Sequence, residues 1–380
     1  MKDSLQDELD GFFKILKNEQ ICVREVSKSA LCKAIKKLKH STFEELNKEV
    51  STYGYDNIFH KTWNGFRLLA IDGSTVRLPK TDEIIEHFGA WHTAKGDICA
   101  IGRVSFLEYI LNDFVVDALI KPKKIGECIM ANQHLTHVGV NDLVLFDRGY
   151  PAFWLFQQVR LKGAEFCMRI NNGVWKVVDQ FFLSGLNERV VRLKPSLSSI
   201  NKCKKMGLPF RPIRIRLLRI TLDNGQTEVL IISLLDRRKY LYELFKDLYA
   251  LRWNIEEKYK AAKSRIQLEN WSGKSVESIY QDFYAKIFIL NLTSILTYYA
   301  NEQVAGSYSD RKHTYQINMT QALSKMKDII VLLFTRHNPL ILLKKLITLF
   351  LNTIEPVRKG RSYRRKHQMQ QVYSIIDSVR

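Results

Sequence analysis

One stretch of the sequence contains four residues, at offsets of 0, 3, 7 and 14, whose side chains can bind phosphates or take part in reactions at phosphorus. They are Tyr249, Arg252, Glu256 and Lys263. The offsets place them on one face of a single helix, because residues three or four apart are neighbours there. A carboxylate between cations and a phenol is expected where a carboxylate-bound metal meets a phosphate backbone. Glu257 is the nearest rival acid, but it lies about 100° off this face.

Two aspartates upstream follow short apolar runs. Asp72 comes after residues 67–71 and Asp147 after residues 142–146, and a glycine-containing turn signal follows each run. We therefore expect each aspartate at the end of a strand. Taken singly, an aspartate before glycine is usually a turn residue, and Asp147 equally suits a helix cap.

The elements around these aspartates follow a recognisable order. Strand-like runs at residues 103–111 and 114–120 predict a hairpin, with its turn at residues 112 and 113. A helix at 126–138, a strand at 142–146, a helix at 152–161 and a strand at 165–170 follow. Three antiparallel strands, a helix, a strand, a helix and a strand make the order of a ribonuclease H-like α/β core with a mixed sheet.

The first and fourth strands of such a core are neighbours, which would bring three acids to one place. Their carboxyl ends would present Asp72 and Asp147 at one edge, and the later helix would add Glu256. Three such carboxylates repel one another and need nearby cations to stay ionised. Two Mg²⁺ ions about 4 Å apart would supply that charge and act on one phosphorus. The chemistry would be phosphodiester hydrolysis or strand transfer.

The spacing Y-(2)-R-(3)-E-(6)-K resembles the signature of bacterial insertion-sequence transposases of the DDE class, in the insertion sequence four family. Residues 71–75 with Leu78 and Pro79 look like the family's first-aspartate motif, and residues 146–150 look like its second. Residues 269–275 fit as well. The likeness extends over most of residues 20–300.

This resemblance implies roles for individual residues. Asp72, Asp147 and Glu256 would be the metal-binding catalytic triad, with Mg²⁺ as cofactor and Mn²⁺ as its substitute. Tyr249, Arg252 and Lys263 would contact phosphates near the cleaved end, and so would Arg169 on the strand after the second aspartate. Some relatives stack a flipped base on an aromatic of the insertion. Trp175 is the candidate here, and ordinary packing is the alternative.

The chain divides into four predicted regions. Residues 1–62 are a helical N-terminal region for DNA binding, and residues 63–170 with 238–300 are the catalytic core. Residues 171–237 are a basic β-rich insertion, and residues 301–380 are a helical region with a basic tail. The alternatives are a solvated surface helix for the N-terminal region, a structural subdomain for the insertion and a solvated arm for the tail. The cations of the insertion that we expect to grip DNA are Arg189, Arg192, Lys194, Lys202, Lys204, Lys205, Arg211, Arg214, Arg216 and Arg219.

Composition points to a nucleic-acid partner. The 380 residues are 46% apolar and carry 59 Lys and Arg against 39 Asp and Glu, a formal charge of +20. Such an excess favours a polyanionic partner over charge carried for solubility or for an acidic membrane. Six scattered cysteines form no C-x-x-C pair, and we see neither a secretory signal nor a membrane span. We therefore expect a cytoplasmic protein that does not enter the membrane.

The prediction is thus a cut-and-paste DNA transposase that binds the double-stranded ends of its element and a target, as a homodimer on DNA. Two alternatives stay open. A ribonuclease H-like nuclease would cut without joining, and a DNA-binding protein with an idle site would bind with steep salt dependence but cut nothing.

Overall fold

The computed structural model describes residues 4–58, 61–92, 96–222, 225–307 and 313–357. The predicted basic tail beyond residue 357 and residues 223 and 224 of the expected Asn-Gly turn lie outside these ranges. Among the described helices, none combines the length and the apolar character that a bilayer crossing requires.

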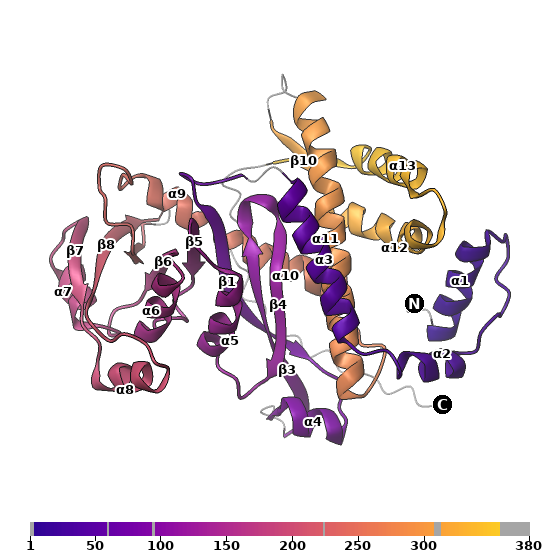
Figure 1. Cartoon of the computed structure of the whole chain (residues 1–380), viewed down its shortest axis with the longest axis horizontal. Helices are drawn as coiled ribbons and strands as arrows, with labels where there is room; N and C mark the ends of the chain where they lie inside the picture. The colour runs from indigo at the N-terminus through magenta and orange to yellow at the C-terminus, as the bar shows by residue number, and fades with distance from the viewer. Residues whose placement is uncertain (1–3, 59–60, 93–95, 223–224, 308–312, 358–380) are drawn as a thin grey trace.

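A nine-stranded mixed sheet forms the body of the protein (Figure 1). Its strands run in the order β2-β3-β1-β5-β6-β9-β8-β7, and β4 also pairs with β3. They are β1 (Arg67–Arg77), β2 (Ala90–His92), β3 (Ile98–Tyr109), β4 (Phe114–Pro122), β5 (Asp142–Phe146), β6 (Glu165–Ile170), β7 (Glu188–Leu193), β8 (Ile213–Thr221) and β9 (Thr227–Ile232).

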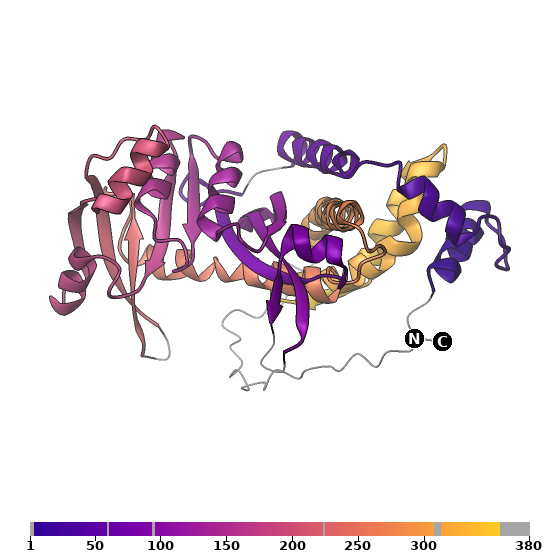
Figure 2. The same ribbon diagram turned by 90° about the horizontal axis from the view of Figure 1, so that it is seen from below.

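Helices cover both faces of this sheet and extend beyond it at one end (Figures 1 and 2). They are α1 (Leu5–Lys17), α2 (Lys28–Ile35), α3 (Ser41–Asn57), α4 (Asp82–Phe88), α5 (Glu127–His134), α6 (Phe153–Leu161), α7 (Lys176–Leu183), α8 (Leu197–Lys205), α9 (Leu244–Ala250), α10 (Trp253–Ser264), α11 (Val276–Ser307), α12 (Met319–Thr335) and α13 (Pro339–Leu351). The terminal helices α1, α2, α12 and α13 lie at the end of the molecule opposite β7 (Figure 1).

The predicted ribonuclease H-like core is confirmed by the pairing of its strands. β1, β3 and β4 are antiparallel neighbours, whereas β1, β5 and β6 pair in parallel. β5 and β6 have the predicted bounds because each is a short apolar run between turn residues. The hairpin turn also forms, with a 3-10 helix (Ile110–Asn112) and Asp113 at φ 52.

The first strand is longer than its sequence suggests. We expected β1 to end at Ile71, but it continues to Arg77. Asp72 to Arg77 pair with Phe106 to Ile101 of β3, so the long antiparallel partner overrides the turn tendency of Asp-Gly-Ser. Parallel pairing with β5 does stop at Ile71, opposite Phe146. Asp72 therefore lies within a strand, at the level where one of its two neighbouring strands has ended.

The insertion continues the core sheet. Its strand β9 pairs antiparallel with β6, and β8 and β7 follow outward. The predicted hairpin forms between β8 and β9, but helices α7 and α8 also belong to this stretch. The insertion thus contains two helices in addition to its three strands.

Side-chain alternation along β1 divides the core into two layers. Leu68 and Ala70 face the layer that includes residues of α9, α10 and α11, and Leu69 and Ile71 face the layer of α5, α6 and α8. Such alternation is the ordinary consequence of the pleat, with both faces covered. The helix α10 is therefore fixed on one known face of β1.

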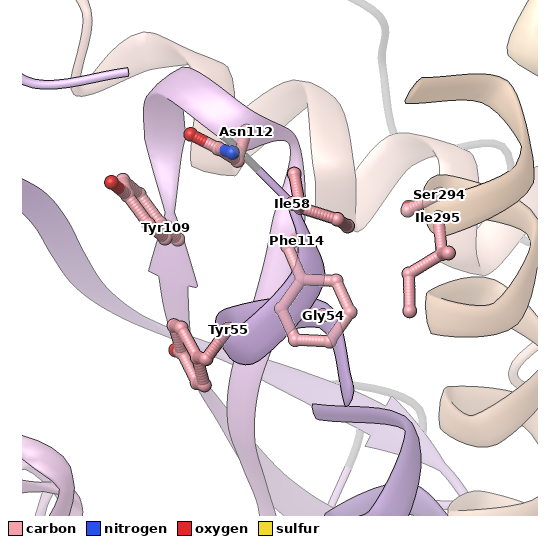
Figure 3. Close-up of a pocket in the computed structure, with 8 residues that line it drawn as sticks. All are labelled: Gly54, Tyr55, Ile58, Tyr109, Asn112, Phe114, Ser294 and Ile295. Carbon is pink, nitrogen blue, oxygen red and sulfur yellow. The ribbon is translucent and has the colours of Figure 1, made fainter. Parts of the chain in front are cut away.

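The long helix α11 joins the N-terminal region to the sheet through a buried amide. Asn291 has no exposed surface; it donates to Asn47 of α3 (2.8 Å) and to the Val115 carbonyl (2.7 Å), and accepts from the Val115 amide (3.0 Å). Farther along the same contact, Gly54 of α3 lies opposite Ile295 beside a small pocket (Figure 3). A Cβ at Gly54 would make an ordinary van der Waals contact with Ile295, 3.4 Å away.

The C-terminal region forms its own small core on α11. Leu346 and Phe350 of α13 and Met326 of α12 are fully buried there. A two-stranded sheet of β10 (Tyr315–Ile317) and β11 (Ile354–Pro356) closes it, so the region predicted as helical also contains strands.

A buried glutamate lies beneath α10 without hydrogen-bond partners. Glu108 on β3 has no exposed surface, and neither carboxyl oxygen has a partner in the described structure. Burial raises its pKa to about 8, opposed by the charge of Lys258 and assisted by that of Asp113. Lys258 itself pairs with Asp113 at 2.6 Å. Glu108 is therefore protonated over a pH range in which an ordinary glutamate is ionised.

This raised pKa predicts a pH-dependent stability. Between about pH 4.5 and 8 the folded protein keeps a proton that the unfolded chain releases, so the free energy of unfolding falls as pH rises. Glu108→Gln removes this loss. We therefore expect the free energy of unfolding of Glu108→Gln, minus that of wild type, to be about 1 kcal/mol or more larger at pH 8.5 than at pH 5. Urea unfolding at both pH values measures it. Glu86→Gln, at an exposed position, is the control, and an equal difference at both pH values would contradict the assignment.

Candidate functional site

The two predicted aspartates lie side by side at one edge of the sheet. Ile71 and Phe146 are the last parallel pair of β1 and β5. The next residues along the chain are Asp72, which is still within β1, and Asp147, which directly follows the end of β5. Ala70 and Leu145 face the layer beneath α10, so side chains two residues further along point to the same face. The expectation that neighbouring strands would present both acids together is met by this register.

The third predicted acid comes from α10, which packs on that face. Ile255, Tyr259 and Ala262 are buried in the shared core and set the rotation of the helix. Glu256 is thereby turned toward β1, where its charge contributes to the electrostatics of Asp72. Glu257 is exposed and pairs with Lys260 at 2.5 Å, so the rival acid points away from the aspartates.

The four signature residues do not share one helix, contrary to our expectation. Tyr249 lies on α9, Arg252 precedes α10, and Glu256 and Lys263 lie on α10. At the junction the amides of Arg252 and Ile255 bond three residues back, to Tyr249 and Arg252, which marks a tightened turn. This turn lets Arg252 point inward, where only 3% of its surface is exposed.

Arg252 lies between two of the predicted acids. One of its terminal nitrogens is 2.8 Å from Glu256, and the other is 3.9 Å from Asp72. Its Nε and Nη1 atoms are buried and have no hydrogen-bond partner in the described structure. Buried donors without an acceptor destabilise the folded state. The site therefore has more hydrogen-bond donors than its own carboxylates accept from.

The environment of Asp72 disfavours its charge. Burial raises the pKa of Asp72 to about 6, and the nearby charges of Asp147 and Glu256 act in the same direction. The Gly73 amide, 2.8 Å from the carboxylate, and the charge of Arg252 oppose this shift. The three carboxylates are therefore close enough to repel, as their predicted gathering requires.

Asp147 has an arginine of its own. Arg169 on β6 donates to Asp147 at 2.9 Å and, through its other terminal nitrogen, to Glu228 of β9 at 2.5 Å. Beside this pair the surface forms a polar cleft, lined by Arg148, Arg169, Ile170, Asn171, Asn172, Phe182, Gln226, Thr227, Glu228 and Val229. Arg169 thus links the core strand β6 to β9, the insertion strand that pairs with it, next to a predicted acid.

The acids offer the ligands of a hard cation, but arginines neutralise them in this structure. In the described part of the chain, no three acidic, histidine or cysteine side chains converge closely enough to hold a metal ion. The donor set of Asp72, Asp147 and Glu256 consists of carboxylate oxygens, which divalent ions such as Mg²⁺ prefer. The guanidinium groups of Arg252 and Arg169 supply positive charge beside these acids. The donor chemistry of the three carboxylates therefore fits such ions, while in this structure Asp147 and Glu256 pair with the two arginines.

Tyr249 and Lys263 both attach the signature helices to strands. The buried hydroxyl of Tyr249 donates to the Phe146 carbonyl at 3.2 Å, directly before Asp147. Lys263 donates to the hydroxyl of Ser74 at 2.9 Å and to the Thr75 carbonyl at 2.8 Å. Their predicted contacts with phosphates stay predictions, and the structure adds an internal partner for each.

Two further residues change our reading of the site. Trp175 packs on Phe156 with ring centroids 5.9 Å apart at the margin of the core, which corresponds to the packing alternative. Tyr259, which we did not single out, donates to the main-chain carbonyl of Asp72 at 2.8 Å. Its position three residues after Glu256, on the same side of the helix, was the signal available in the sequence.

Comparison with known proteins places the chain among transposases. The family model described as "Transposase DDE domain" matches residues 63–292, more than half of the chain. That range begins just before β1 and ends within α11, so it contains all three predicted acids.

Individual relatives are distant. The transposase InsG for insertion sequence element IS4 of Escherichia coli strain K12 is 25% identical over 271 residues, which cover 70% of this chain and 60% of that protein. The transposase for insertion sequence element IS231C of Bacillus thuringiensis subsp. berliner is 27% identical over 126 residues, 33% of this chain and 25% of that protein. The chain thus spans less than two thirds of the length of these curated relatives.

Among solved structures, the cryo-EM structure of a piggyBac transposase synaptic complex with hairpin DNA matches with a TM-score of 0.45 and 9% identity. The match covers 97% of this chain and 80% of the other.

The contacts of Lys263 predict a measurable contribution to stability. Lys263→Met keeps most of the apolar stem but removes both hydrogen bonds to β1. We expect the free energy of unfolding to fall by about 1 kcal/mol. Lys260→Met, on an exposed part of the same helix, is the matched control. Urea denaturation compares the two, and equal stability of both variants would show that α10 is fixed to β1 by other contacts.

Proposed function

Because the chain belongs to the transposase DDE domain family, we propose that it is a DNA transposase that cuts out an insertion sequence and joins it to target DNA. The observation that carries this proposal is the gathering of Asp72, Asp147 and Glu256 at one sheet edge from β1, β5 and α10. Three acids so placed have no evident structural task, since their repulsion costs stability.

The family in general uses divalent metal ions, and we propose that these three carboxylates hold Mg²⁺, with Mn²⁺ as a substitute. When bound, such ions activate a nucleophile and stabilise the leaving oxygen at phosphorus. Arg252 and Arg169 keep the acids together as compensating charges. Their guanidinium groups have further donors, which suit the phosphate oxygens of a DNA strand.

The proposed partner is double-stranded DNA, at the element ends and at the target, with two copies of the chain on the DNA. Exposed arginines on the insertion support this. Arg192 on the edge strand β7 stands directly opposite Arg214 on β8; both are exposed, and neither pairs with an acid in the described residues. Two like charges held opposite each other are unfavourable unless an anion lies near them.

Two arginines of the predicted DNA-binding set have internal roles instead. Arg216 is fully buried, donating to Glu188 at 2.7 Å and to the Tyr240 carbonyl at 2.6 Å. Arg219 donates to the carbonyls of Leu186 and Phe182. Their side chains hold the insertion together, so the DNA contacts we propose rest on the exposed cations.

The triad is tested by excision in vitro, using purified protein, Mg²⁺ and a plasmid that carries the gene with its flanking DNA. Asp72→Asn, Asp147→Asn and Glu256→Gln should each lower excision by about a thousandfold or more, because metal ions supply several kcal/mol of transition-state stabilisation. Glu257→Gln is the matched control and should stay active. DNA binding by each variant is measured in parallel.

The outcomes of this experiment separate three activities. Release and reinsertion of the element by wild type alone support a transposase. Metal-dependent cutting without joining would point to a nuclease, and binding without cutting to an idle DNA-binding protein. Full excision by Glu256→Gln would contradict our choice of the third acid.

The opposed arginines give a second prediction. Replacing Arg192 and Arg214 by Gln should weaken binding to the element ends and reduce the slope of log affinity against log salt by about 2, since about two phosphate contacts are lost. Lys344→Gln with Lys345→Gln on α13 removes the same charge from exposed positions elsewhere and is the control. Titration at several salt concentrations measures both, and an unchanged slope in the first pair would exclude this surface.

A further inference from the structure

The main-chain carbonyl of Asp72 accepts hydrogen bonds from two side-chain hydroxyls. Tyr259 of α10 donates at 2.8 Å and Ser105 of β3 at 3.1 Å. Tyr259 belongs to the layer of α10, whereas Ser105 contacts His134 on α5, so the hydroxyls approach from opposite faces of the sheet. Parallel pairing with β5 stops one residue earlier, whereas antiparallel pairing with β3 continues through Asp72 to Arg77.

Ser105 is itself fixed by a polar chain that runs from the buried His134 to the partly exposed Asp117. Its hydroxyl is 2.9 Å from Nε2 of His134, and Nδ1 of His134 is 2.7 Å from the carboxylate of Asp117. The single hydrogen of Ser105 can serve only one acceptor. If it goes to the Asp72 carbonyl, Nε2 of His134 donates to Ser105, and the other ring nitrogen lies against the carboxylate of Asp117.

The order Ser, His, Asp is that of a hydrolytic relay, but its burial assigns it another task. Ser105 and His134 have no exposed surface, so no substrate reaches the hydroxyl. A nucleophilic serine needs an open side next to the group that it attacks. Here the open side of the hydroxyl is filled by the main chain of Asp72.

Tyr259 connects two of the proposed metal-binding acids. It lies one helical turn after Glu256 and stacks on Phe106, with ring centroids 4.3 Å apart and planes 12° apart. Phe106 is the register partner of Asp72 in β3. A movement of α10 that displaced Glu256 would therefore also break the bond from Tyr259 to Asp72.

We propose that Tyr259 and the chain Ser105, His134 and Asp117 are positioning residues that fix the main chain of Asp72 and so place its carboxylate for metal binding. This inference rests on the proposed function. Partners behind a ligand commonly set metal affinity, and their loss costs about 10- to 100-fold. Because both hydroxyls share one acceptor, each partly compensates for loss of the other.

The test uses the full-length protein and the variants Tyr259→Phe, Ser105→Ala and the double variant. Binding of Mn²⁺ is measured directly, from the loss of the free-ion signal in electron paramagnetic resonance. The Mn²⁺ concentration that half-saturates cleavage of element ends is measured alongside it. We expect each single variant to bind Mn²⁺ about tenfold more weakly and the double variant to lose more than the product of the two effects. End binding without metal should match wild type.

A matched control separates positioning from stability. Tyr109→Phe also removes a buried hydroxyl that donates to a carbonyl, that of Lys61 at 3.0 Å, away from Asp72. It should lower the melting temperature as much as Tyr259→Phe does, but leave Mn²⁺ affinity unchanged. Equal weakening of Mn²⁺ binding in both variants would overturn the proposal.

Asp72→Asn distinguishes failure of this inference from failure of the proposed function. If Asp72→Asn abolishes Mn²⁺ binding while Tyr259→Phe and Ser105→Ala bind as wild type does, the positioning role is wrong and the metal site stands. If Asp72→Asn binds Mn²⁺ like wild type, the metal site is wrong and the inference falls with it.

Discussion

Repulsion among carboxylates is the constraint on which the centre of this protein depends. Asp72, Asp147 and Glu256 are brought together by strand register and helix packing, which are set by apolar contacts that ignore charge. The cost is offset locally by Arg252 and Arg169, each within hydrogen-bond distance of one of these acids. The turn between α9 and α10, the burial of Arg252 and the pairing of β6 with β9 are arrangements that deliver these two cations.

Prediction from the sequence is most accurate for elements whose structure is decided by one local signal. β5 and β6 are apolar runs between turn residues, and their bounds follow directly. Asp72 is different, because its Asp-Gly-Ser context favours a turn and only the distant partner β3 keeps it in a strand. The split of the signature between α9 and α10 was also hidden, since spacing alone is the same for a continuous helix and for one with a tightened turn.

The sequence shows which residues are charged, but not whether each charged side chain faces solvent or an internal partner. Arg192, Arg214, Arg216 and Arg219 look equivalent in the sequence, yet alternation and the approach of neighbouring loops expose the first two and bury Arg216. The same limit applies to Tyr259 and Ser105, whose hydroxyls meet at Asp72 only after the sheet and α10 are assembled. The acids of the site carried a recognisable pattern, whereas Ser105 carried none and Tyr259 carried only its helical spacing from Glu256.

The pairing of β9 with β6 also bears on how the insertion can change during evolution. Ile170, Arg169, Met168 and Cys167 of β6 use one side of their main chain to bond β9. A chain shortened by removal of residues 171–237 would leave that side of β6 as an open edge, with unpaired amide and carbonyl groups among buried apolar side chains. Such edges recruit other strands and lead to aggregation. The insertion can therefore vary in its outer strands and helices, but a strand in the place of β9 is a condition for the core to stay soluble.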